Sequence, residues 1–179
     1  MSRHAKTLEL TLAILKPDLM SNIFAAQNVR QRILKNGFYF VKTRNLHLTT
    51  SEAAQFYGEH EGKFFFNRLV TYMTSGPIRT HILARDNAIK QWRMLLGATK
   101  VNKTVYAEPD SIRGEFGLSD TRNCVHGSDS PATARREINF FFPDFNIEMW
   151  MATKQNFFLQ NKVSFNENLN EHLILPEET

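Results

Sequence analysis

The sequence has only one cysteine, Cys124, among its 179 residues. A single cysteine cannot form an intrachain disulfide, and it excludes a metal cluster built from several cysteines. Low cysteine usage is typical of reducing compartments such as the cytoplasm, so we expect an intracellular protein. The sequence also shows no internal repeat and no low-complexity segment. Its length fits one sizeable domain with its own core and an added tail.

Long apolar runs are missing as well. No stretch approaches the roughly 20 apolar residues that a membrane-spanning helix needs, so we expect no membrane partner. Hydrophobic residues make up 42% and charged residues 22% of the chain, an ordinary balance for a globular domain. The net charge of +4 suits an anionic partner, but an excess of this size does not separate a nucleotide from a nucleic acid. A nucleic-acid partner is the weaker of the two, because no basic and aromatic stripe is present.

Tryptophan and tyrosine are scarce, with 2 Trp and 4 Tyr, whereas phenylalanine is abundant, with 15 residues. Two phenylalanine triplets, at residues 64–66 and 140–142, account for much of this load. A triplet cannot place all of its rings on one face of a helix. Some of these rings must therefore meet another element, a ligand or a partner.

The hydrophobic pattern predicts strands that alternate with helices. Period-two alternation, or runs rich in β-branched and aromatic residues, predicts strands over residues 8–14, 38–48, 78–84 and 122–125. Helical spacing, bounded by capping residues, Gly or Pro, predicts helices over residues 23–35, 49–58, 64–74, 86–97 and 131–142, with Asp86 as the cap of the fourth. Residues 98–121 lack any periodicity, and we expect a long functional loop there.

These elements predict an α+β fold, with an antiparallel or mixed sheet of about four strands covered by helices. The predicted domain spans residues 1–150. After Trp150 the chain becomes polar and rich in asparagine, so residues 151–179 are expected to form a C-terminal extension that packs on the domain surface or is partly disordered. The first seven residues are basic and free of acids, but they are too few to predict a transit peptide.

The most informative segment is Arg122 to Ser130, with the sequence R-N-C-V-H-G-S-D-S. Ser130 and Pro131 are typical of a helix start, since a hydroxyl caps free N–H groups and a proline fits the first helical position. His126 is therefore predicted at a strand end, beside the positive end of a helix. An anion can bind at such a place.

The chain contains the residue types that phosphoryl transfer requires. Such a reaction needs in-line positioning and cations on the phosphate oxygens, and it can use a nucleophile that carries the group. His126 is the candidate nucleophile. Glu137 lies eleven residues later on the following helix, where its carboxylate can orient one ring nitrogen of the histidine. Further candidates for phosphate contacts are the cations Lys16, Arg93 and Arg113 and the neutral donors Thr99 and Asn123.

Each side chain also has a structural explanation. These explanations are a surface or capping role for His126, solvation for Lys16, a core position for Phe65, a surface ion pair with Asp86 or Glu108 for Arg93, and a solvated charged face shared with Arg135 and Arg136 for Glu137. Taken one at a time, the residues do not decide between structure and chemistry.

Taken together, six motifs in order along the chain resemble the nucleoside diphosphate kinase family. They are A-I-L-K-P-D at Ala13 to Asp18, R-L-V-T-Y-M-T-S-G-P at Arg68 to Pro77, W-R-M-L-L-G-A-T at Trp92 to Thr99, S-I-R-G-E-F-G at Ser111 to Gly117, the His126 segment, and R-E-I at Arg136 to Ile138. The resemblance covers roughly residues 8–150. It implies a ferredoxin-like βαββαβ antiparallel sheet with extra helices.

The resemblance also implies a function. The family transfers the γ-phosphate from a nucleoside triphosphate such as ATP to a nucleoside diphosphate, by a ping-pong mechanism through a phosphohistidine and with Mg²⁺ bridging the phosphates. His126 matches the phosphorylated histidine, and Glu137 matches the carboxylate that orients it. The remaining matches are Lys16, Arg93, Arg113, Thr99 and Asn123 for phosphate and ribose contacts, Tyr57 and Ser128 for support of the histidine and its neighbours, and Phe65 for stacking on the base. Stacking is open to every base, so broad specificity is expected.

Two departures from the common family pattern stand out. The loop between Thr99 and Ser111 is longer by about three residues, within ordinary loop tolerance. In the family this loop also builds subunit contacts, so a homo-oligomer is expected but the usual hexamer is in question. Asp120 stands where an apolar residue usually faces the stacked base, and its charge lies near an anionic ligand. With the extended tail, these departures resemble the divergent nucleoside diphosphate kinase 6 subgroup, which is associated with mitochondria and with reduced kinase activity.

Two hypotheses follow. The first is a nucleoside diphosphate kinase, in which the complete set of site residues is used for turnover. The second is a nucleotide-binding member of the family with weak or no turnover, in which the tail or the inserted loop binds a protein partner.

Overall fold

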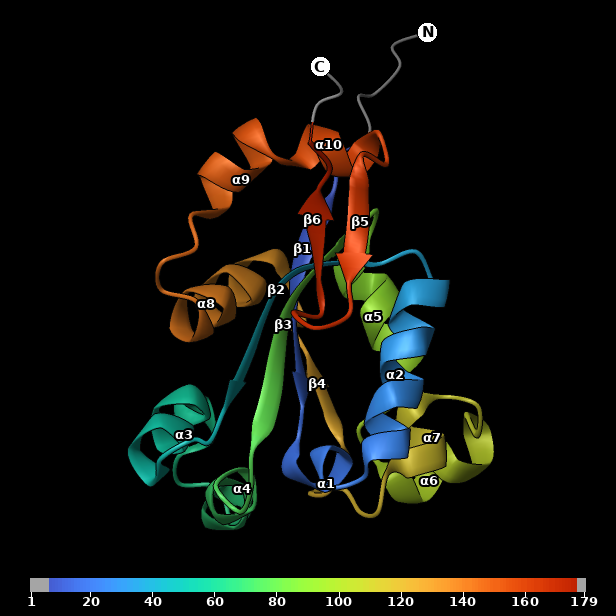
Figure 1. Ribbon diagram of the computed structural model, residues 1–179. Helices are drawn as coiled ribbons and strands as arrows, with labels where there is room; N and C mark the ends of the chain where they lie inside the picture. Colours follow the sequence, from blue (N-terminus) through green and yellow to red (C-terminus); the bar gives the residue numbers. More distant parts are fainter. Residues whose placement is uncertain (1–6, 177–179) are drawn as a thin grey trace, which may run out of the picture.

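A four-stranded antiparallel sheet forms the centre of the molecule. The structure is a computed structural model that describes residues 7–176. The strands are β1 (Glu9–Leu15), β2 (Tyr39–Leu46), β3 (Ile78–Arg85) and β4 (Val125–Gly127), in the spatial order β2-β3-β1-β4 (Figure 1). All three pairings are antiparallel. The predicted ferredoxin-like α+β fold is confirmed.

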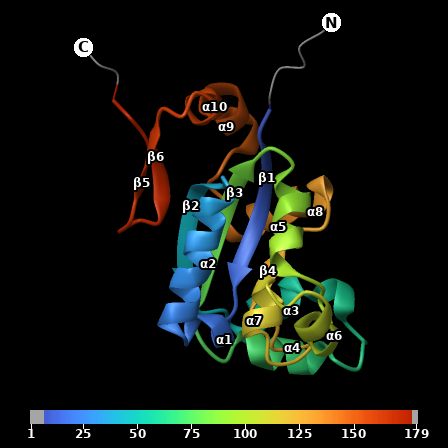
Figure 2. The same cartoon turned by 90° about the vertical axis from the view of Figure 1, so that its right-hand side faces the viewer.

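Helices cover both faces of the sheet (Figure 2). On one face lie α1 (Pro17–Met20), α2 (Ile23–Lys35) and α5 (Ala88–Leu96), and on the other α3 (Thr50–Phe56), α4 (Phe66–Met73) and α8 (Pro131–Phe141), with a 3₁₀ turn, η1 (Gly58–His60), after α3. Each face therefore has its own hydrophobic core.

The central strand β1 shows how the sequence builds these two cores. Leu12 and Ile14 pack into one core, and Ala13 and Leu15 pack into the other, because successive side chains of a strand point to opposite faces. The alternation of leucines predicts a strand with one buried face. The strand is instead buried on both faces, since it lies between β3 and β4 and helices cover both sides.

The prediction of a long loop over residues 98–121 is wrong, because this segment contains two short helices, α6 (Val101–Ala107) and α7 (Ile112–Phe116). Each is too short to show a clear apolar period, with Val101 and Ile112 as their main buried hydrophobic residues. The Ser111 side chain caps α7 by accepting a hydrogen bond from the backbone N–H of Gly114.

Two predicted boundaries also differ from the structure. The fourth strand was expected over residues 122–125, but β4 begins at Val125 because Cys124 has a φ of +61°, which interrupts the extended chain. Asp86 does not cap α5. Asn87 occupies that position in a left-handed conformation, with a φ of +51° and no capping side-chain hydrogen bond.

Residues beyond 150 fold back onto the domain. They include the last turn of α9 (Ile147–Thr153), then α10 (Gln155–Leu159) and a hairpin of β5 (Val163–Asn166) and β6 (Glu171–Ile174). Trp150 and Phe158 are buried in the core on the α8 side of the sheet. Of the two expectations for the extension, packing on the domain therefore holds through residue 176. None of the helices in residues 7–176 is long and apolar enough to cross a membrane.

The hairpin lies beside the open edge of β2 (Figure 2). It covers this edge with side chains rather than with another backbone ladder. Phe40 N–H donates to Nδ1 of His172 at 2.9 Å, and Thr43 N–H donates to Oε1 of Glu171 at 2.8 Å. An uncovered edge strand presents free N–H groups to other chains, so these two acceptors protect the edge.

Candidate active site

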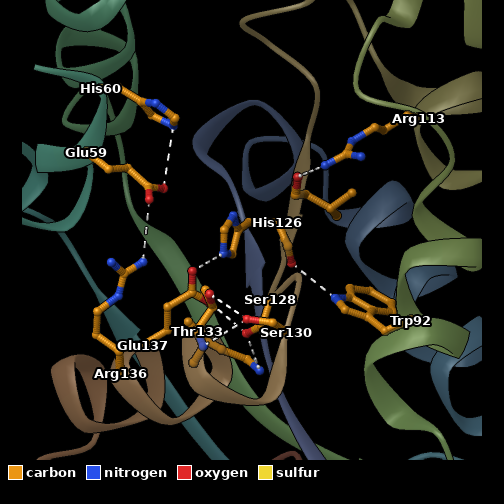
Figure 3. A network of polar contacts seen from close by, with 12 residues as sticks. Glu59, His60, Trp92, Arg113, His126, Ser128, Ser130, Thr133, Arg136 and Glu137 are labelled. Carbon is orange, nitrogen blue, oxygen red and sulfur yellow. Dashed lines mark hydrogen bonds and ion pairs between the residues drawn. The ribbon is translucent and has the colours of Figure 1, made fainter. Parts of the chain in front are cut away.

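His126 lies in the middle of β4 and faces the α8 side of the sheet. Its Nε2 atom is 3.0 Å from Oε1 of Glu137, as the helix start at Ser130 and the eleven-residue spacing predict (Figure 3). The strand pairing places His126 opposite Ile14 of β1, two residues before Lys16. The site is thus assembled where β1 ends and β4 begins.

Glu137 is buried, with 3% of its surface exposed, so it does not belong to a solvated charged face. The Ser128 hydroxyl donates to Oε2 of Glu137 at 2.6 Å and accepts from Leu12 N–H at 3.2 Å. A carboxylate only accepts hydrogen bonds, so Nε2 of His126 must be the donor in its bond to Oε1 of Glu137. The neutral imidazole then has its lone pair on Nδ1, for which the described residues provide no hydrogen-bond partner.

The start of α8 sets the position of Glu137. Ser130 is the N-cap, with its hydroxyl accepting from Thr133 N–H at 3.2 Å, and Pro131 is the first helical residue, as predicted. Helical spacing then places Ala134, Glu137 and Ile138 on the buried face. The carboxylate consequently replaces an apolar residue on the inner face of the helix.

Trp92 holds the backbone of the histidine from the other side of the sheet. Its Nε1–H donates to the His126 carbonyl oxygen at 3.0 Å (Figure 3). A Cβ on Gly127 would lie only 2.6 Å from Cδ1 of Trp92, so only glycine allows this close packing. The sequence indicates a core position for Trp92 by its helical spacing, but nothing in it marks this contact with the site.

Lys16 and Asn123 form a buried pair next to the histidine. The Nζ atom of Lys16 donates to Oδ1 of Asn123 at 2.6 Å, and Lys16 N–H donates to the Cys124 carbonyl at 2.9 Å. Burial, aided by the positive charge of Arg113, lowers the pKa of Lys16 to about 8. A buried ammonium group with one neutral acceptor is poised for an anion.

Arg113 is the second buried cation. Its guanidinium donates to the Gly97 carbonyl at 2.7 Å and to the Val125 carbonyl at 2.9 Å, and its buried Nε has no partner among the described residues. Burial lowers its pKa to about 10.

The hydroxyl of Tyr57 is also buried without a partner in the described chain, and burial together with the charge of Glu137 raises the pKa of Tyr57.

Three predicted site residues lie outside the buried cluster around His126, at the rim of the site, and form no hydrogen bond to that cluster. Arg93 is exposed on α5 near Asp129, whose pKa is held low mainly by the Thr133 hydroxyl and less by Arg93. Thr99 is exposed in the loop that follows α5. Phe65 is half-buried just before α4, with its ring 5.4 Å from that of His60.

Two open cavities flank the site without including His126. One, of about 1020 Å³, is lined by Arg93 and Asp129 among others. The other, of about 980 Å³, is lined by Tyr72 and by the carboxylates of Asp18 and Asp120. The candidate site is therefore defined by the buried polar contacts of His126 rather than by either cavity. Within residues 7–176, no group of three or more His, Cys, Asp or Glu side chains could hold a metal ion.

Comparison with known proteins identifies relatives with the same fold and overlapping extent. The family model described as nucleoside diphosphate kinase matches residues 9–147. Nucleoside diphosphate kinase 6 of Danio rerio is 44% identical over 96% of this chain and 98% of its own length. The protein of the same name from Homo sapiens is 50% identical over 86% of this chain and 82% of its own.

Among solved structures, a nucleoside diphosphate kinase of Aquifex aeolicus has a TM-score of 0.73 and 36% identity, and covers 76% of this chain and 96% of its own. The match to the Danio rerio protein spans 172 residues and therefore includes most of the chain beyond residue 147, where the family model ends. The C-terminal helices and hairpin thus fall largely within the match to the Danio rerio protein.

Proposed function

Because the chain belongs to the nucleoside diphosphate kinase family, we propose that it transfers the γ-phosphate of a nucleoside triphosphate to a nucleoside diphosphate by a ping-pong mechanism. His126 is the residue that carries the phosphoryl group in this proposal. The proposal rests on one arrangement, the bond between Nε2 of His126 and the buried carboxylate of Glu137, which leaves Nδ1 as the nucleophilic nitrogen.

Phosphate binding comes first. Lys16 and Arg113 supply positive charge in a buried setting, where Coulomb attraction to a polyphosphate is stronger than in water. Their hydrogen bonds to Asn123 and to backbone carbonyls fix both groups before a ligand arrives, so little orientation is lost on binding. Arg93 and Thr99 at the rim, and Phe65 for the base, complete the proposed nucleotide contacts.

The transfer step then uses the neutral imidazole. Nδ1 attacks the γ-phosphorus, the bond from phosphorus to the β,γ-bridging oxygen breaks, and the nucleoside diphosphate leaves with that oxygen. Positive charge develops on the ring, and Glu137 stabilises it through Nε2–H. In the second half-reaction, a terminal oxygen of another nucleoside diphosphate attacks the same phosphorus and Nδ1 leaves.

We also propose Mg²⁺ as the cofactor, held chiefly by the nucleotide phosphates. The residues present fit this assignment, since the buried cations Lys16 and Arg113 would hold the phosphates and magnesium keeps few protein ligands in phosphate sites. Bound there, the ion neutralises charge that develops on the phosphate oxygens.

Labelling tests the proposal directly. The protein is incubated with γ-labelled ATP and Mg²⁺, and acid-labile label on His126 is expected, which a nucleoside diphosphate then removes. His126→Ala should abolish the label. Because the side chain is only 21% exposed and its Nε2–H donates to the buried carboxylate of Glu137, the free energy of unfolding should also fall by about 1–3 kcal/mol, so the variant is first shown to be folded. Absence of label on the folded wild-type protein would overturn the proposal.

A second candidate function is nucleotide binding with weak or no turnover. Asp120 favours it, because this exposed carboxylate lines the same cavity as Asp18 and adds negative charge where an anionic ligand approaches. Binding of a nucleotide without transfer of label would support this alternative.

A further inference from the structure

The second phenylalanine triplet meets the site through one ring of α3. Phe56, the last residue of α3, packs against the imidazole of His126 with ring centroids 5.5 Å apart and an interplanar angle of 73°. This is an edge-to-face contact between two half-buried rings. Phe56 is thus a second side chain, besides Glu137, that touches the ring of His126.

The same helix that carries Glu137 also holds Phe56 in place. Phe140 and Phe141 lie three and four residues after Glu137 on α8, and therefore on the same side of the helix. Their ring centroids are 5.5 and 4.9 Å from that of Phe56. The carboxylate and the aromatic contact of His126 are consequently fixed by one rigid element.

A small cavity of about 350 Å³ lies behind these two contacts. Phe56 and Glu137 both line it, together with Phe140 and the charged side chains of Glu59 and Arg136, whereas His126 does not. The cavity has polar walls and room for water. Phe56 and Glu137 thus contact both the imidazole and this cavity. Its charged residues Glu59 and Arg136 lie on the opposite side of His126 from Arg113 and Trp92 (Figure 3).

We propose that Phe56 is a positioning residue that shields the bond between His126 and Glu137 from water, a role that rests on the proposed transfer through His126. Water from the cavity would compete for Glu137 and would allow a proton to leave Nε2 while another binds Nδ1. A protonated Nδ1 has no lone pair and cannot attack phosphorus. The ring of Phe56 excludes this exchange and restricts rotation of the imidazole.

The experiment compares three variants with the wild-type protein. Phe56→Ala removes the ring, and Phe56→Tyr restores it with a hydroxyl that can point toward the polar cavity. Phe145→Ala is the matched control, since Phe145 is also half-buried and packs against the same core, but near Trp150 rather than His126. Each variant is measured by nitrogen-15 NMR of the His126 ring, by single-turnover labelling with γ-labelled ATP, and by ADP affinity.

We expect the wild-type ring to carry its proton on Nε2, and Phe56→Ala to populate the Nδ1–H form. Labelling by Phe56→Ala should be slower by about 10- to 100-fold, the range typical of lost orientation, at unchanged ADP affinity. Phe56→Tyr should restore both the tautomer and the rate. Phe145→Ala should lose stability but keep both.

The inference is overturned if Phe56→Ala retains the wild-type tautomer, or if Phe145→Ala alters the tautomer equally. The NMR measurement requires no turnover, so it separates this inference from the proposed function. A wild-type protein without label would overturn the transfer mechanism, while a tautomer shift confined to Phe56→Ala would still support the shielding role.

Discussion

The Nζ atom of Lys16 donates a 2.6 Å hydrogen bond to Oδ1 of Asn123, a residue 107 positions further along the chain. The strand pairing makes this contact, since β1 ends at Leu15 directly opposite Val125. Both partners are buried, and burial lowers the pKa of the Lys16 ammonium group to about 8. The positive charge that the proposed phosphate contact would use therefore titrates near pH 8.

The first prediction concerns the alkaline limb of activity. The pKa of Lys16 lies below its ordinary value, so the folded protein without nucleotide loses this charge as pH rises through about 8. One unit above that pKa only about a tenth of the molecules carry the charge, and kcat/KM should fall roughly tenfold per further unit. Steady-state kinetics across this range measure the effect. A profile that stays flat to about pH 9 would contradict it, and Lys16→Arg, which stays charged, should flatten the limb.

The second prediction concerns Ser128. Its hydroxyl joins Glu137 to Leu12 N–H, so Ser128→Ala leaves a buried donor and a buried acceptor each short of one bond. We expect the free energy of unfolding to fall by about 1–3 kcal/mol, measured by urea denaturation, and labelling of His126 to slow. Ser164→Ala is the control, since Ser164 is exposed on β5, and it should change stability by less than about 0.5 kcal/mol. Equal losses in both variants would argue against the buried network.

Local sequence patterns were enough to predict most of the helices and strands of the domain. The capping residues of α8 are adjacent in sequence, and Ser130 followed by Pro131 placed Glu137 on the correct helix. The helices α6 and α7 were missed because each offers only one buried apolar position, Val101 in α6 and Ile112 in α7. The start of β4 was missed because Cys124 has a left-handed backbone. Cysteine rarely adopts this conformation, so the sequence does not indicate it.

In the candidate site, too, contacts between residues close in sequence could be predicted, whereas contacts between distant elements could not. The bond of His126 to Glu137 was predictable because both residues lie in one strand–turn–helix unit. The contacts of His126 with Phe56 and Trp92 depend on the packing of distant helices, so an aromatic residue at either position predicts only a core. Family resemblance supplied the distant cations, which spacing alone does not bring together.

The third prediction concerns acid and the C-terminal hairpin. Nδ1 of His172 accepts from Phe40 N–H, which requires the neutral ring, and partial burial lowers the pKa of His172. The nearby His81 is fully buried and its pKa is lowered to about 3. A folded pKa below the unfolded one means that the unfolded state binds more protons. Stability is therefore complete above about pH 6.5, the unfolded value, and is lost as pH falls toward the folded pKa values.

Urea denaturation between about pH 7 and 5 measures this dependence. The charged groups on the hairpin are Glu171, which pairs with Lys42, and Glu167, which pairs with Arg30. The free energy of unfolding should fall by up to about 1.4 kcal/mol per pH unit for each proton that only the unfolded state binds. His172→Phe should reduce that slope and lower stability at neutral pH. Leu173→Ala, an exposed neighbour without a titratable group, should leave the slope unchanged. An identical slope in His172→Phe would sink the prediction.

The last prediction concerns the charge of Asp120. This side chain is exposed and lines a cavity that Tyr72 and Asp18 share, and Tyr72 lies 6.0 Å from the Lys16 ammonium. A carboxylate near the proposed phosphate-binding cations repels an incoming polyphosphate, but solvent screens the repulsion. Asp120→Asn removes the charge at constant size and should lower KM for nucleoside triphosphates by roughly two- to fivefold, the scale of exposed charge interactions. The difference should shrink as salt is added, and Asp110→Asn, an exposed acid on the other cavity, serves as the control. A KM that is unchanged at low salt would show that Asp120 does not limit nucleotide binding.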